Sequence, residues 1–190
     1  MKQRKEERKV SGGARKMIRS LTYSAIFLAL AQVLPFLTGQ IPQIGNMFCP
    51  MHYPVLLCGF VCGWPWGMAV GLIAPIMRSL IFGMPPLYPT AIAMAFELAA
   101  YGAVSGVFYR ILPKKKWNVY VSLLIAMLAG RLVWGGAQYI LLGMQGKQFS
   151  ASAFYAGAVS QAIPGIILQI VLIPVIVMLL QKAGYICNRD

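Results

Sequence analysis

Residues 72–102 read LIAPIMRSLIFGMPPLYPTAIAMAFELAAYG and carry only two charges, Arg78 and Glu97, among apolar side chains. The whole chain is similar: of its 190 residues, 59% are hydrophobic and 11% are charged. Soluble domains average about 45–50% apolar and about 25% charged residues. A globule of this size has too little interior to bury so much apolar surface, so lipid is the expected solvent. Because helices of about 20 apolar residues cross a bilayer, the sequence predicts an all-α integral membrane protein.

The net charge of +13 is concentrated beside the apolar segments. Eight of the 17 Lys and Arg residues fall in residues 1–19, and three more form the run at 114–116. Basic residues in such flanks stay on the cytoplasmic side, so we expect both termini to be cytoplasmic and expect no nucleic-acid binding. The long basic front argues against a cleaved signal peptide, although the sequence ALA at 29–31 resembles a cleavage site.

Breaks rich in Gly and Pro divide the chain into six apolar segments, which we expect to be six transmembrane helices. The segments are 17–37, two short ones within 47–83, 87–109, 119–142 and 153–181. The two short segments leave five spans as the alternative, if the hairpin over 47–83 is re-entrant. The expected organisation is a disordered basic tail over 1–16, a six-helix membrane domain over 17–182 and a cytoplasmic tail over 183–190.

Three charged residues fall inside the apolar segments. A helical rise of 1.5 Å per residue places Arg78, Glu97 and Arg131 at similar depths, between the centre and the outer half of the bilayer. A charge at a helix centre costs about 2.5–3.5 kcal/mol on insertion scales, so such residues face a bundle interior or a watery cavity. They therefore predict a functional site. The alternative is structural: Glu97 bonded to one arginine would only lock two helices together.

Polar stripes support a pocket that opens outward. Arg131, Trp134 and Gln138 are spaced three and four residues apart and share one helical face. Two arginines against one glutamate would make the pocket net positive and favour an anionic group on the ligand. The loop over 38–54 would act as a lid. The predicted substrate-binding residues are Arg131, Trp134, Gln138, Glu97, Arg78, Tyr88, Asn46, His52 and Gln161.

Catalytic and nucleotide-binding motifs are missing from the sequence. It has no P-loop, no H-E-x-x-H and no G-x-S-x-G, so we expect no catalytic residues and no cofactor. Cys58 and Cys62 are four residues apart without further ligands nearby, so we expect no metal site. These gaps favour a binding subunit that is energised by partner subunits. Ala25 and Ala29 support this interpretation, because small residues four apart let another helix approach closely.

Together these residues resemble the substrate-binding (S) components of energy-coupling factor (ECF) transporters, in the branch that takes up vitamins. The resemblance covers roughly residues 17–182. It is strongest in PMHYPVLLCGFVCG (50–63) and GLIAPIMRSLIFGMPPLYPTAIAMAFELAAYGAVSG (71–106), and the A-x-x-x-A pattern of the first segment adds to it.

The resemblance implies a six-helix bundle in a bacterial plasma membrane that captures a water-soluble vitamin or precursor at the outer face. Pantothenate suits a positive pocket, and folate and cobalamin stay open. ATP-driven import would require a membrane coupling subunit and two ATPase subunits, with Ala25 and Ala29 as docking positions. Relatives for nickel and cobalt use a Met-His at the free N-terminus, whereas Met51-His52 is internal, which argues against a metal cargo. The alternative is a structural or regulatory membrane protein without a ligand.

Overall fold

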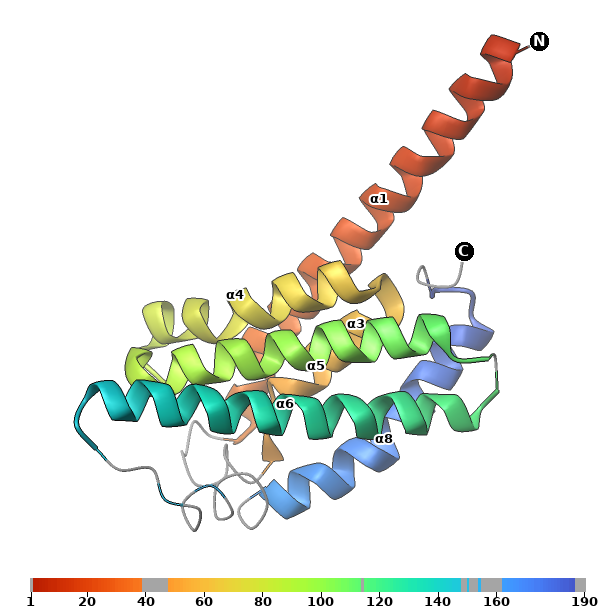
Figure 1. Ribbon diagram of the computed structural model, residues 1–190. Coiled ribbons are helices and arrows are strands. Elements are labelled where there is room, and N and C mark those ends of the chain that lie inside the picture. Colours follow the sequence, from red (N-terminus) through yellow and green to blue (C-terminus); the bar gives the residue numbers. More distant parts are fainter. Residues whose placement is uncertain are drawn as a thin grey trace.

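The protein is a bundle of helices, shown as a computed structural model in Figure 1. The structure describes residues 2–38, 48–113, 115–147, 150, 154 and 162–186. The helices are α1 (Lys2–Val33), η1 (Leu34–Thr38), α3 (His52–Cys62), α4 (Trp64–Phe82), η2 (Leu87–Ala91), α5 (Ile92–Ile111), α6 (Trp117–Met144) and α8 (Ile163–Lys182). Within these residues, five helical segments are long and apolar enough to cross a bilayer. The prediction of an all-α membrane bundle is confirmed.

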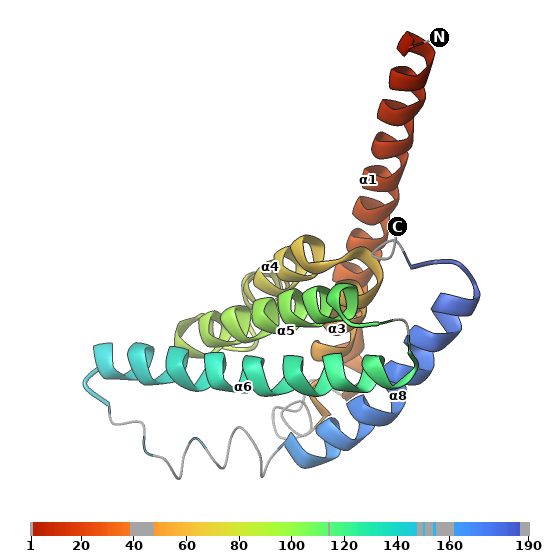
Figure 2. The same ribbon diagram turned by 45° about the vertical axis from the view of Figure 1, so that its right-hand side comes forward.

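Helix α1 begins at Lys2, inside the segment 1–16 that the sequence suggested to be a disordered tail. Residues 2–9 consist only of Lys, Arg, Glu and Gln, which are all good helix formers. Figures 1 and 2 show the N-terminal part of α1 projecting beyond the other helices. The division of the chain at residues 16 and 182 stays a prediction.

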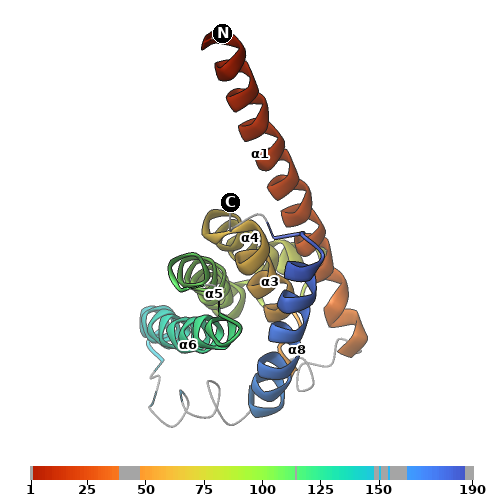
Figure 3. The same cartoon turned by 90° about the vertical axis from the view of Figure 1, so that its right-hand side faces the viewer.

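Helix α3 is short and central. Its 11 residues are all buried, and they rise about 16 Å, half of the roughly 30 Å hydrocarbon core. It packs against α1, α4, α5 and α8, and Figure 3 shows it among these helices. The first half of the predicted 47–83 hairpin is therefore an internal helix too short to span the bilayer on its own. The count of six spans is not confirmed. The described residues form five helical segments long enough to span the bilayer, together with the short helix α3.

Glycines bring α3, α4 and α5 into backbone contact. A Cβ atom on Gly67 would lie 2.7 Å from the Gly102 carbonyl oxygen and 2.7 Å from the Gly59 Cα. A Cβ on Gly102 would overlap the Gly67 backbone in return. The three helices therefore cross at a point where no side chain separates them. Gly63, with φ of 98°, forms the turn between α3 and α4.

The two described ends of the chain lie at the same end of the bundle. The Arg19 Nη2 donates a hydrogen bond of 2.6 Å to the Gly184 carbonyl. In Figure 1 the turn between α5 and α6, which holds Lys115 and Lys116, lies on this side as well. The arrangement agrees with the charge pattern that places these segments together, and their cytoplasmic location stays a prediction.

Candidate functional site

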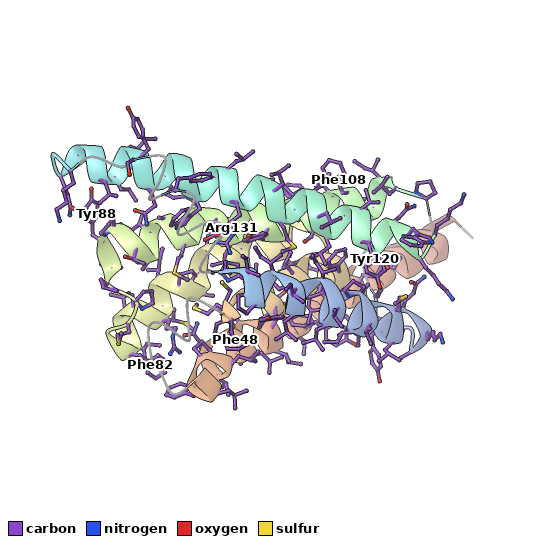
Figure 4. The ribbon with its side chains drawn as sticks, turned by 90° about the horizontal axis from the view of Figure 1, so that it is seen from below. Phe48, Phe82, Tyr88, Phe108, Tyr120 and Arg131 are labelled. Atoms are coloured by element: carbon purple, nitrogen blue, oxygen red, sulfur yellow. The ribbon has the colours of Figure 1, made fainter. Side chains whose placement is uncertain are left out.

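A buried ion pair joins α5 to α6 in the middle of the bundle. Arg131 Nη1 lies 2.9 Å from Glu97 Oε1. The Glu97 side chain is only 2% exposed and that of Arg131 is 14% exposed. Figure 4 shows Arg131 near the middle of α6, directed toward the interior between the helices. The sequence argument placed these two charges at one depth, and the structure brings them into contact.

Residues from the start of α3 complete this centre, which we call the Glu97 cluster: Cys49, His52, Glu97, Tyr101 and Arg131. His52 Nε2 lies 3.4 Å from Glu97 Oε1, a longer contact than the 2.9 Å of the arginine pair, and neither contact has hydrogen-bond alignment. The His52 ring meets the Tyr101 ring edge to face, with centroids 5.1 Å apart. Arg131 Nη2 donates to Cys49 Sγ at 3.7 Å.

Several polar atoms at this centre are buried without a hydrogen-bond partner. Among the residues that the structure describes, they include His52 Nδ1, Tyr101 Oη and Arg131 Nε, and Gln169 Nε2 is a further unpaired atom elsewhere in the bundle. Gln169 lies on α8, which packs against α3 and α6. Most buried polar atoms are paired with protein or water, and an unpaired one costs about 1–3 kcal/mol. Unpaired polar atoms close to a buried ion pair are the arrangement expected where a polar ligand supplies the missing partners.

The other predicted residues of α6 continue the same face outward from Arg131. Gln138 is buried, and the Trp134 ring lies 6.2 Å from the ring of Phe154, centroid to centroid. Tyr88 has a structural contact: its hydroxyl donates a 2.6 Å hydrogen bond to the Leu141 carbonyl, which ties η2 to α6. Asn46 and Gln161 lie outside the described residues, so their predicted roles stay predictions.

Arg78 occupies a different environment from the Glu97 cluster. Its Nη1 donates a 2.8 Å hydrogen bond to the Gln32 carbonyl on α1. The guanidinium carbon lies 5.2 Å and 5.1 Å from the ring centroids of Phe36 and Phe82. Gln32 in turn donates through Nε2 to the Ala74 carbonyl of α4 at 3.0 Å. These contacts hold the outer end of α1 against α4, and they account for a charge that is 4% exposed.

We therefore expect Arg78→Ala to lower the free energy of unfolding by about 2–4 kcal/mol. It removes a charged hydrogen bond, worth about 1.5–3 kcal/mol, and desolvated cation–π contacts worth up to about 2 kcal/mol. Thermal unfolding in mild detergent measures the change. Arg110→Ala, at an exposed position in the last turn of α5, is the matched control and should change little. A folded Arg78→Ala protein that loses its ligand would instead place Arg78 in the binding site.

The predicted docking face is open in this chain. Ala25 and Ala29 are both exposed on α1, whereas the neighbouring small residues Ser24 and Ala31 are buried. Ser24 faces inward, with its Oγ 3.5 Å from Cys58 Sγ. Another helix can therefore reach the A-x-x-x-A pattern without displacing part of the bundle. That a partner subunit docks there stays a prediction.

One residue of the site has no counterpart in the sequence reasoning. Cys49 is not among the predicted binding residues, yet its sulfur accepts a hydrogen bond from Arg131. The only available signal was its position three residues before His52. Within the described part of the chain, no group of three His, Cys, Asp or Glu side chains is placed to hold a metal ion.

Comparison with known proteins gives one family. A family model described as "ECF transporter, substrate-specific component" matches residues 19–177, from within α1 to within α8. A search of curated proteins finds no match.

Proposed function

The chain belongs to the substrate-specific components of ECF transporters, and on this premise we propose that it captures a water-soluble vitamin or vitamin precursor at the outer face of the membrane. It is a multi-pass membrane protein by the family match and by its apolar helices. The family implies association with a coupling and ATPase module, so ATP hydrolysis in two partner ATPase subunits would drive import. Catalysis is not expected in this chain.

The observation that carries the proposal is the Glu97 cluster. An ion pair that only fastened α5 to α6 would not leave His52 Nδ1, Tyr101 Oη and Arg131 Nε unpaired in the same cluster. Intramembrane ionisable residues facing a bundle interior are functional by default. A cargo with hydrogen-bond donors and acceptors would satisfy these atoms, and the Trp134 ring would cover an apolar part of it.

The charge of the cluster bears on the choice of cargo. Glu97 matches Arg131, and the second permanent cation, Arg78, lies against α1. The balance of two arginines against one glutamate, which made pantothenate attractive, therefore does not describe the cluster itself. An anionic cargo such as pantothenate would have to recruit Arg78. We propose a polar vitamin or precursor, without further restriction.

The experiment is to purify the protein in mild detergent and identify the retained small molecule by mass spectrometry. We then expect Trp134→Ala to weaken binding of that molecule about tenfold or more, which corresponds to about 1.4 kcal/mol of lost contact. Trp117→Ala is the matched control, because Trp117 is 78% exposed at the other end of α6. Equal affinities of the two variants would remove Trp134 from the site.

The structural alternative keeps one observation in its favour, the short 2.9 Å contact between Glu97 and Arg131. A protein that uses this pair only for packing would retain no small molecule and would not co-purify with ATPase subunits. Affinity purification from membranes, followed by identification of the partner proteins, separates the two functions.

A further inference from the structure

An apolar hollow opens at the surface between α1 and α8, away from the Glu97 cluster. It has a volume of about 190 Å³, and the surface that faces it is entirely apolar. Phe27 and Val61 form its floor and are 9% and 2% exposed, whereas Ile26 and Tyr185 are 51% and 49% exposed at its rim. The residues that line it are Tyr23, Ile26, Phe27, Val61, Leu180 and Tyr185.

The hollow arises because α1 and α8 each pack on the short helix α3. The contacts that bridge the two helices lie past the end of α8. The Tyr23 and Tyr185 rings meet edge to face with centroids 6.2 Å apart, and Arg19 Nη2 reaches the Gly184 carbonyl. The hollow is thus closed at the end where the chain termini lie, and its lateral opening faces the position of the acyl chains.

Positive charge lies close to the closed end of the hollow in the sequence, and Arg19 lies at that end in the structure. Lys16, Arg19 and Tyr23 are three and four residues apart, so both cations lie on the face of α1 that carries Tyr23. Arg19 lies over that ring, 5.4 Å from its centroid. Lys182 is exposed at the end of α8. The sequence has no acidic residue between positions 8 and 96, so the membrane part of α1 carries no acidic side chain.

From this geometry we infer that the hollow binds one anionic glycerophospholipid of the cytoplasmic leaflet. An acyl chain fills the apolar hollow, and the phosphate lies against Lys16, Arg19 and Lys182. The apolar hollow matches the acyl chain of such a lipid, and the three cations match its phosphate. The cytoplasmic leaflet holds the anionic lipids that basic segments attract. A side chain from a partner helix would fill the hollow but would make no use of the three cations. The site is independent of the cargo, but its rim residue Ile26 lies three residues before Ala29, so the hollow adjoins the exposed Ala25–Ala29 face.

The test uses the full chain in bilayers that contain phosphatidylglycerol and phosphatidylcholine in equal amounts with identical acyl chains. After gentle extraction, native mass spectrometry should show phosphatidylglycerol bound to the protein at least about five times more often than phosphatidylcholine. Equal retention of the two lipids would overturn the proposal.

Two variants locate the bound lipid. The triple variant Lys16→Gln/Arg19→Gln/Lys182→Gln should abolish the preference for phosphatidylglycerol. Its matched control, with the exposed cations of the α5–α6 turn neutralised at the same end of the bundle, should keep it. The control substitutions are Arg110→Gln, Lys115→Gln and Lys116→Gln. Equal losses in both triple variants would show general surface attraction and would contradict a defined site.

Ile26→Trp tests the seat of the acyl chain separately, because a larger side chain at the exposed rim fills the hollow without entering the core. It should reduce lipid retention at least about fivefold while thermal unfolding stays near wild type. Unchanged retention would place the lipid elsewhere. A photoreactive residue at position 26 should give lipid adducts in native membranes, and adducts with protein alone would show that a partner helix occupies the hollow instead.

Discussion

Glu97→Leu is expected to lower the free energy of unfolding by about 3–5 kcal/mol, because it leaves the Arg131 guanidinium buried without its partner. Arg131→Met should also be destabilising, because it leaves the Glu97 carboxylate buried without its partner. The double variant Glu97→Leu/Arg131→Met replaces the pair by apolar side chains of similar size. It should be close to wild type in stability, as found where buried ion pairs are replaced in this way.

Chemical or thermal unfolding in mild detergent measures these differences. Arg110→Met, at an exposed position outside any described ion pair, is the control and should stay within about 0.5 kcal/mol of wild type. If the two single variants are as stable as the double variant, Glu97 and Arg131 do not form a desolvated pair.

The double variant also separates the two functions considered above. A stable double variant that no longer retains the small molecule would show that the pair is kept for binding. A stable double variant with unchanged binding would mean that the pair only fixes packing, and the cargo site would have to be sought elsewhere in the bundle.

Gly102→Ala should have the second large effect, a loss of at least about 3 kcal/mol with little folded protein recovered from membranes. The added methyl group would overlap the backbone of Gly67, and backbone atoms cannot rotate away as a side chain can. Overpacking of this kind forces the helices apart and costs typically 1–3 kcal/mol, occasionally more. The yield of monodisperse protein after extraction and its unfolding temperature are the measurements.

Gly136→Ala on α6 is the matched control, because no atom lies within 4 Å of the position of its Cβ. Alanine is the better helix former by about 1 kcal/mol, so this variant should equal or exceed wild type in stability. Similar behaviour of the two variants would show that α4 and α5 do not cross in backbone contact at Gly102.

The sequence predicted the long helices well because their determinants are local. An apolar run of about 20 residues and a Gly or Pro break are visible without knowledge of the neighbours, and α4, α5 and α6 follow them closely. The start of α1 is different. Its first residues are charged, which suggested disorder, but the same side chains have high helix propensity.

The sequence could predict how far along its helix each charged residue of the site lies, but not which neighbouring helix its side chain faces. The 1.5 Å rise fixes how far a residue lies along a span, and this brought Glu97 and Arg131 together correctly. Depth does not fix which neighbour a helix face meets. Arg78 has a similar depth, yet its face of α4 meets α1 and Phe36, so it has no described contact with Glu97. Cys49 belongs to the cluster because it lies in the chain just ahead of α3. Helical periodicity does not predict the position of a residue outside a helix.

The internal position of α3 has a consequence for which substitutions this sequence can accept during evolution. Every residue of α3 is buried, whereas one side of α8 faces outward, as Ile167 and Val171 do with exposures of 59% and 59%. Substitutions in α3 should therefore be tolerated only if they preserve the volume and shape of the side chain. Substitutions on the outer surface of α8 need only preserve its hydrophobicity. Leucine, isoleucine, valine and phenylalanine should interchange freely on α8, while in α3 even one added methylene would have to be matched by a loss of volume in a neighbouring helix.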